Sequence, residues 1–171
     1  EMPEQEGGVA VLLGPVSVAD YLQRDALLQR LPDGSIAADP QQARWAGSLK
    51  EDVDQLLMRQ LATQLKTQKI ESAPASEGFV ADVQIELAIT RLDSGPQHPA
   101  VLEAQWRLLD EHGKRQGSRL VRLQEAHQGS ITDQVQAQSR LLQRLSVMLA
   151  EAIEPVLVAR NAAKTTVKAP K

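Results

Sequence analysis

The sequence predicts an α+β fold: a two-layer sandwich in which two amphipathic helices pack on one face of a mostly antiparallel sheet. Two runs of alternating apolar and polar residues, 79–90 and 102–108, predict strands with one buried face. Two leucine-rich segments with apolar residues at helical spacing predict the helices. The chain of 171 residues is long enough for one domain, which we expect to span residues 8–159.

The first part of the chain is predicted to contain short strands. The apolar run Val9–Leu13 predicts a buried strand that ends at Gly14-Pro15, and an irregular segment should follow. The turn residues Pro32-Asp33-Gly34-Ser35 predict a short hairpin. Asp39-Pro40 is then expected to open a loop.

The first helix is predicted over about 49–67. Ser48 and Glu51 fit a capping box, in which each side chain bonds to the backbone N–H of the other residue. Acidic residues in the first turn suit the positive end of the helix dipole. The apolar positions that follow have helical spacing: Val53, Leu56, Leu57, Leu61 and Leu65.

The second half of the sheet is predicted as an antiparallel meander. A loop at 72–78 precedes the first long strand, and the turn residues of 93–99 should separate it from the second. A tight turn at 110–113 leads to a third, less regular strand at about 118–125. Such a meander has one dry face, against which the helices would pack.

The last helix is predicted over about 132–158, with Pro155 expected to kink it or end it early. Residues 160–171 are basic and lack apolar periodicity, so we expect a disordered tail. The favoured interpretation of this tail is a solvated terminus. The alternative is that its basic residues contact anionic lipid headgroups.

Composition argues against several classes of function. The chain has only four aromatic residues and a net charge of −3, so we expect no nucleic-acid partner. It has no cysteine, which excludes disulfides and thiol chemistry. The longest uncharged run near the front, 7–19, is too short to span a bilayer. It also follows acidic residues where a signal peptide would be basic.

No pattern in the sequence indicates catalysis. Phosphate-binding glycine loops and nucleophile elbows are absent, and His98, His112 and His127 lie singly, without zinc-ligand spacing. The acidic residues at the start of the first helix are explained by its dipole. We therefore expect no enzyme, no cofactor and no metal site, with a small hydrolase as the weakest alternative.

Several short segments, taken in order, resemble one family. They are Gly14-Pro15-Val16, Tyr21-Leu22-Gln23-Arg24, a hairpin, and Arg44-Trp45-Ala46-Gly47-Ser48-Leu49 before a leucine-rich helix. Their order is similar to that of the PqiC/YmbA-like group of ABC-type transport auxiliary lipoproteins, over about 9–158. The family often has proline at position 25 and Glu-Pro at 47–48, where this chain has Asp25 and Gly47-Ser48. The lipid-bearing cysteine of the family is not in this sequence.

The resemblance implies a non-catalytic lipoprotein on the periplasmic face of the Gram-negative outer membrane. It would be an accessory or docking component of an MCE-type (Pqi-like) intermembrane lipid transport system, and it would form homo-oligomers. The partner would be an MCE-family protein that bridges the envelope. The alternative is a periplasmic carrier or chaperone that itself holds a lipid in an apolar pocket.

Four residues in the family-like segments are the candidate partner or oligomer contacts: Tyr21, Arg24, Arg44 and Trp45. Trp45 lies just before the predicted helix start, where it either packs over the seam of sheet and helix or faces a partner. Burial is the favoured interpretation, because a buried tryptophan stabilises a fold by a few kcal/mol. Trp45→Ala should then lower the melting temperature. Unchanged stability with loss of binding would instead identify an interface anchor.

Overall fold

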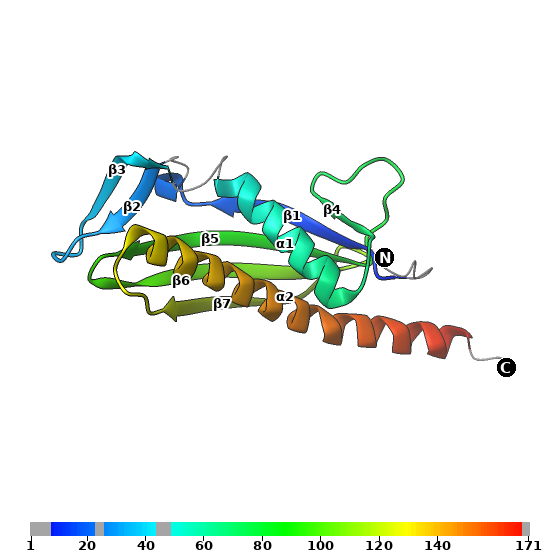
Figure 1. The fold of residues 1–171 in the computed structure, drawn as a ribbon. Coiled ribbons are helices and arrows are strands. Elements are labelled where there is room, and N and C mark those ends of the chain that lie inside the picture. Colours follow the sequence, from blue (N-terminus) through cyan, green and yellow to red (C-terminus); the bar gives the residue numbers. More distant parts are fainter. Residues whose placement is uncertain (1–7, 23–25, 44–48, 169–171) are drawn as a thin grey trace.

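The computed structural model describes residues 8–22, 26–43 and 49–168, and it has the α+β architecture that the sequence predicts. Helices α1 (Leu49–Leu65) and α2 (Ile131–Lys168) lie on one face of a seven-stranded sheet (Figure 1). The strands are β1 (Val11–Val18), β2 (Ala26–Arg30), β3 (Ile36–Ala43), β4 (Ile70–Ser72), β5 (Val83–Gly95), β6 (His98–Asp110) and β7 (Arg115–Glu125).

Strand β5 is the centre of the sheet. Strand β6 pairs with it in antiparallel register along its length, and β7 pairs with β6. The other edge of β5 is shared by two strands that run parallel to it: β1 along residues 83–89 and β2 at Ser94 alone. Strand β4 extends the sheet in parallel beside β1, and β3 forms a hairpin with β2. The meander is therefore as predicted, whereas the parallel pairings of β1 are not.

Strand β1 continues through Gly14-Pro15, where the sequence pattern predicts its end. A bulge there places two residues of β1, Gly14 and Pro15, against one of β5, because Leu13 pairs with Ile85 and Val16 with Leu87. The bulge keeps both Leu13 and Val16 on the buried face. Gly14 has a φ of 122°, which only glycine adopts readily. Its carbonyl accepts a hydrogen bond of 2.7 Å from the Gln84 side chain.

Strand β3 also extends beyond its predicted limits, through Asp39-Pro40 to Ala43. Proline is tolerated there because β3 is an edge strand and residues 40–42 lie in an irregularity of its ladder with β2, where Ala26 pairs with Ala43 and Leu27 with Asp39. The predicted turn is confirmed: the Leu31 N–H donates to the Ser35 carbonyl at 2.8 Å, and the Ser35 N–H donates to Asp33 Oδ1 at 2.9 Å.

Helix α1 ends two residues before the predicted position. Lys66 has a φ of 52°, and the Thr67 N–H donates to the Ala62 carbonyl at 3.1 Å, which closes the last turn. The chain can then reverse into β4, a strand that the sequence pattern does not predict, since only its last residue, Ser72, falls in the predicted loop. Ser48 lies outside the described residues, so the capping box stays a prediction.

Strands β5 and β6 extend into the region predicted as a turn. Asp93 and Ser94 are turn-forming residues by propensity, yet both are fully buried in β5. A second bulge, at Thr90, keeps Ile89 and Leu92 on the same buried face although three positions separate them. Tertiary partners of Asp93 and Ser94, from β2 and α2, decide the structure of this segment.

Helix α2 extends past Val158, its predicted end, to Lys168, so residues 160–168 of the expected disordered tail lie in the helix. Pro155 is exposed and does not end it. A proline removes one helical hydrogen bond, and on the exposed side water can take its place. In Figure 1 this part of α2 projects beyond the sheet.

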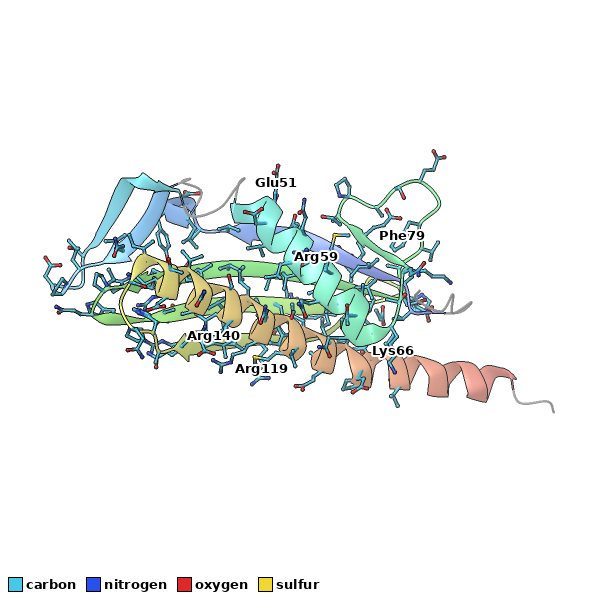
Figure 2. The ribbon with its side chains drawn as sticks, viewed as in Figure 1. Glu51, Arg59, Lys66, Phe79, Arg119 and Arg140 are labelled. Carbon is cyan, nitrogen blue, oxygen red and sulfur yellow. The ribbon has the colours of Figure 1, made fainter. Side chains whose placement is uncertain are left out.

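The apolar stripes of both helices face the sheet and form one core with it. Val53, Leu57 and Leu61 of α1 and Leu141 and Leu145 of α2 have at most 1% exposure. Charged side chains such as Glu51, Arg59 and Arg140 lie on the outer surface of the helices (Figure 2). The opposite face of the sheet, called the open face below, is not covered by any described helix.

Candidate functional site

One of the four candidate contact residues, Tyr21, has a described position. It lies in a short 3-10 helix, Asp20–Leu22, that connects β1 to β2. Arg24, Arg44 and Trp45 lie outside the described residues, so their grouping with Tyr21 stays a prediction. Arg44 and Trp45 follow the end of β3 directly in the chain.

Tyr21 fills the gap between β1 and β2 along the edge of β5. Its hydroxyl oxygen accepts a hydrogen bond of 3.2 Å from the Leu92 N–H, which lies between the last pair with β1, at Ile89, and the pair with β2, at Ser94. The hydroxyl donates in turn to Asp93 Oδ2 at 3.4 Å. Burial raises the pKa of Tyr21 above its usual value, so the hydroxyl keeps its proton and can act as this donor.

Asp93 is the centre of a polar cluster, the Asp93 cluster, that also contains Tyr21, Arg30 and Arg91. Arg30 binds the carboxylate with two hydrogen bonds, Nε to Oδ1 at 3.0 Å and one terminal nitrogen to Oδ2 at 3.1 Å. Arg91 Nε donates to Oδ2, also at 3.0 Å. The Asp93 side chain is only 1% exposed. Burial by itself would raise the pKa of Asp93, but hydrogen bonds from the two arginines lower it overall.

The Asp93 cluster continues across the open face. Arg91 lies 4.0 Å from Glu103 of β6, and Arg122 of β7 lies 3.4 Å from the same carboxylate. These outer pairs are partly exposed and contribute little to stability on their own. Together with the Asp93 cluster, these ion pairs connect four neighbouring strands, β2, β5, β6 and β7, by side chains of alternating charge.

A second polar group lies on the helix-covered side of the same strands. Ser94 donates a hydrogen bond of 2.8 Å to Gln134 of α2 and accepts one of 3.0 Å from Gln138. The Gln134 amide also donates to Gln29 of β2 at 3.3 Å. One side-chain oxygen, Gln138 Oε1, has no hydrogen-bond partner among the described residues. This group fixes the start of α2 to both β5 and β2.

Two histidines, His98 and His127, connect backbone segments at this end of the sheet. His98 Nε2 lies 2.8 Å from the Leu31 carbonyl, and His127 Nε2 lies 2.7 Å from the His98 carbonyl. His127 Nδ1 accepts from the Gly129 N–H at 2.9 Å. Because carbonyls only accept and Gly129 donates, a neutral His127 carries its proton on Nε2. His112 lies apart, in an exposed turn.

These contacts fix the β2–β3 hairpin to the sheet by polar groups. Among the described residues, one pair, Gln29 with Ser94, joins β2 to β5 in the ladder. The hairpin also approaches Gly95 so closely that a Cβ there would overlap the Arg30 carbonyl oxygen. Gly95 is therefore required for the close approach of the two backbones.

The Asp93 cluster was missed in the sequence, although one signal for it is present. Arg91 and Asp93 are two positions apart in a strand, so their side chains share one face. Opposite charges at that spacing indicate a local pair. The involvement of Arg30, which is 63 positions away, depends on the parallel docking of β2 and has no local signal.

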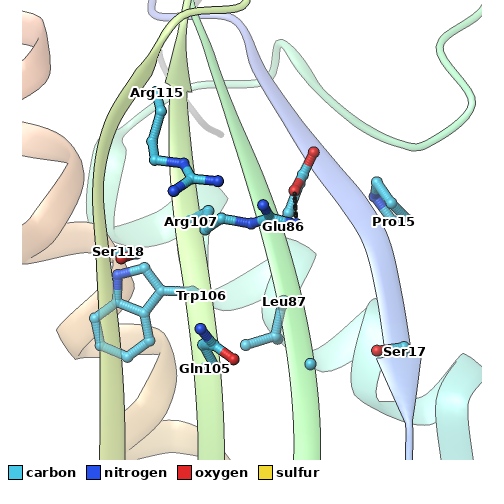
Figure 3. A pocket seen from close by; sticks show the side chains of 10 residues that line it. Pro15, Ser17, Glu86, Leu87, Gln105, Trp106, Arg107, Arg115 and Ser118 are labelled. Atoms are coloured by element: carbon cyan, nitrogen blue, oxygen red, sulfur yellow. Dashed lines mark ion pairs between the residues drawn. The ribbon is translucent and has the colours of Figure 1, made fainter.

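A shallow hollow of about 440 Å³ lies on the open face, over β1, β5, β6 and β7 (Figure 3). Its lining includes the ion pair of Glu86 and Arg107, whose nitrogen and oxygen are 3.1 Å apart. Across residues 8–22, 26–43 and 49–168, no group of three or more histidine, aspartate or glutamate side chains is placed to hold a metal ion. In the same ranges, neither helix has the length and apolarity needed to cross a membrane.

Comparison with known proteins identifies relatives of this fold. The family model for the ABC-type transport auxiliary lipoprotein component matches residues 1–150. An uncharacterized protein of known structure is similar with a TM-score of 0.73 and 19% identity, covering 84% of this chain and 92% of its own. A Xanthomonas campestris protein of the DUF330 family has a TM-score of 0.72 and 14% identity, covering 91% and 88%.

A more distant structural likeness is to PelC from Paraburkholderia phytofirmans, which forms a dodecamer. Its TM-score is 0.50 at 16% identity, with 87% of each chain covered. At such identities the solved structures show a common fold. No curated protein matches the chain.

Proposed function

Because the chain belongs to the family of ABC-type transport auxiliary lipoprotein components, we propose that it is a docking component of an MCE-type intermembrane lipid transport system. Membership of the family implies a place in the Gram-negative cell envelope. The proposal goes further: the protein works on the periplasmic face of the outer membrane, forms a homo-oligomer and contacts an MCE-family protein, without catalysis. The match of the family model over residues 1–150 carries the proposal.

Two further observations support a docking role. The open face of the sheet carries exposed polar and charged side chains, among them the pairs Glu86–Arg107 and Glu103–Arg122, which suits reversible contact between proteins. The likeness to PelC, a dodecamer, supports self-association. The Asp93 cluster anchors the hairpin, and the chain continues from the end of that hairpin into Arg44 and Trp45, two of the proposed contact residues.

The experiment is co-purification with the MCE-family protein of the same genome, together with sizing chromatography of the chain alone. Arg24→Ala, Arg44→Ala and Trp45→Ala should each weaken the oligomer or the complex. Arg59→Ala is the matched control, since Arg59 is an exposed arginine on the outer surface of α1. The proposal would be refuted if the chain were strictly monomeric and bound no MCE protein, and if the three contact variants behaved like the Arg59→Ala control.

The alternative, a lipid carrier, requires an apolar cavity of several hundred Å³. Three surface hollows have volumes of about 440, 680 and 620 Å³, and each is lined in part by charged residues. The lining of these hollows does not favour a buried acyl chain. Native mass spectrometry of the purified chain tests this directly, because a carrier would retain a co-purified lipid.

A further inference from the structure

The hollow on the open face has a composition that the docking role does not require. Four polar side chains from three strands surround it, and all four residues are exposed: Ser17 of β1, Gln105 of β6, and Arg115 and Ser118 of β7. In Figure 3 the Arg115 side chain extends toward that of Arg107 on the neighbouring strand. Hydroxyl, amide and guanidinium groups are the donors that proteins use for phosphate oxygens.

Arg115 differs from the other arginines of β7. Arg119 lies over the Trp106 ring, 5.9 Å from its centroid, and Arg122 pairs with Glu103. Arg115 has no acidic or aromatic partner among the residues that the structure describes. Charged residues are common protection on edge strands. An arginine that also lines a hollow beside a second guanidinium is placed to bind an anion.

The charges within the hollow leave one positive charge uncompensated. Glu86 and Arg107 are directly opposite each other in the ladder, and their contact of 3.1 Å makes one balanced pair. Arg107 has further N–H groups beyond the one that meets Glu86. Arg115 adds a full charge beside this pair, so a monovalent or divalent anion can be bound by two guanidinium groups.

The dimensions of the hollow favour more than a bare phosphate. It spans four adjacent strands, which is three spacings of about 4.8 Å, or roughly 14 Å. Pro15, exposed by the bulge at Gly14-Pro15, marks the far border on β1. A phosphate at Arg115 leaves space toward Ser17 and Gln105 for a small polar substituent.

We propose that this hollow binds a phosphate ester with a small hydroxylated substituent, the chemistry of an anionic phospholipid headgroup or of a free sugar or glycerol phosphate. Arg115 and Arg107 hold the phosphate, and Gln105, Ser17 and Ser118 contact the substituent. The proposal goes beyond docking and does not depend on an MCE-family partner. Its failure would leave the proposed docking role unaffected.

The test measures binding of glycerol 3-phosphate to the full chain by NMR titration at low salt. Arg115→Gln should weaken binding by at least about tenfold, because a charge-assisted pair is lost. The matched control is Arg119→Gln, which removes the same charge from the same strand but on the helix-covered side of the sheet. Its affinity should stay within about twofold of wild type.

A second variant should change the affinity in the opposite direction. Glu86→Gln removes the negative charge of the hollow and frees Arg107, so binding should tighten by about two- to tenfold. A variant that merely destabilised the fold would weaken binding, so this increase in affinity cannot come from an effect on folding. Backbone amide spectra of each variant show whether the fold is retained.

The source of the phosphate is decided by two more probes, inorganic phosphate and vesicles of phosphatidylglycerol in phosphatidylcholine. Binding of the vesicles that Arg115→Gln abolishes assigns the site to lipid headgroups. Binding of the soluble phosphates alone assigns it to a free phosphate ester. The proposal is overturned if no probe binds saturably, or if Arg119→Gln weakens binding as much as Arg115→Gln.

Discussion

Two regions of the sheet exclude solvent by different interactions. One is the middle of the sheet, where β1 lies beside β5, and the other is its far end, where β2 pairs with β5. In the middle, Leu13, Ile85 and Leu57 pack as apolar groups with no measurable exposure. At the far end, Asp93 and Ser94 are equally buried but are held by hydrogen bonds and ion pairs. The two regions of one sheet therefore depend on different forces.

The difference matters for what each region specifies. Apolar packing tolerates exchanges of similar volume, because the interaction has little directional preference. A buried carboxylate requires its partners in fixed positions, since an unpaired buried charge is strongly destabilising. The polar end thus fixes the position of the hairpin, while the apolar middle supplies most of the stability of the sheet.

The largest effect should come from Asp93→Ala, which leaves Arg30, Arg91 and the Tyr21 hydroxyl without their common acceptor. We expect a loss of about 3–5 kcal/mol in the free energy of unfolding, measured by urea denaturation. Asp33→Ala, in the exposed hairpin turn, is the control and should change stability far less. Equal stability of both variants would mean that the polar end does not hold the hairpin.

Leu145→Ala tests the apolar side of the comparison. Leu145 is fully buried on the side of α2 that faces the sheet, so its truncation should cost about 2–5 kcal/mol through lost transfer energy and a cavity. Leu145→Met, which nearly conserves volume, should cost less than about 1.5 kcal/mol. A methionine variant as unstable as the alanine variant would show that the core here demands a specific shape.

Tyr21→Phe should have a smaller effect, because it keeps the ring and removes only the hydroxyl. The Leu92 N–H then loses its acceptor, and we expect a loss of about 1–3 kcal/mol. Hydrogen exchange of the Leu92 amide should also become faster. If the amide stays protected, another group has replaced the hydroxyl, and Tyr21 does not close the gap between β1 and β2.

The two regions should respond differently to acid. The folded pKa of Asp93 is lower than its usual value, so the stability from this carboxylate is complete above the unfolded pKa of about 4. It is lost as the pH falls through the folded pKa. The stability difference between wild type and Asp93→Asn should therefore shrink below about pH 4. The difference between wild type and Leu145→Ala should not change, and a parallel decline of both would contradict this account.

Arg119→Gln should have the smallest effect on stability. The guanidinium lies over Trp106 at an exposed edge, where such a contact contributes about 0.5–1 kcal/mol. Thermal unfolding should show a small decrease in the melting temperature. A large decrease would mean that the edge strand β7 depends on this contact for its pairing.

The sequence alone determined the elements that have strong periodicity. The alternation from Val83 to Ile89 predicts a strand with one buried face, and the stripe from Leu141 to Ile153 predicts a helix that covers it. These patterns arise because one side of each element is buried, and the residues on that side are apolar. The hairpin at Pro32–Ser35 was predictable for a similar reason, since its turn residues are local.

Only the tertiary structure decided the conformation of the segments whose sequence patterns are weak. The bulge at Gly14-Pro15 allows β1 to continue, because its partner strand β5 supplies hydrogen bonds that no local propensity records. Asp93 lies in a strand because Arg30, from a distant segment, replaces the water it would otherwise need. Tyr21 was selected from the sequence as a contact for a partner, and the structure places its hydroxyl against β5 of its own chain. Such outcomes depend on contacts between residues far apart in the chain, and a one-dimensional pattern does not contain them.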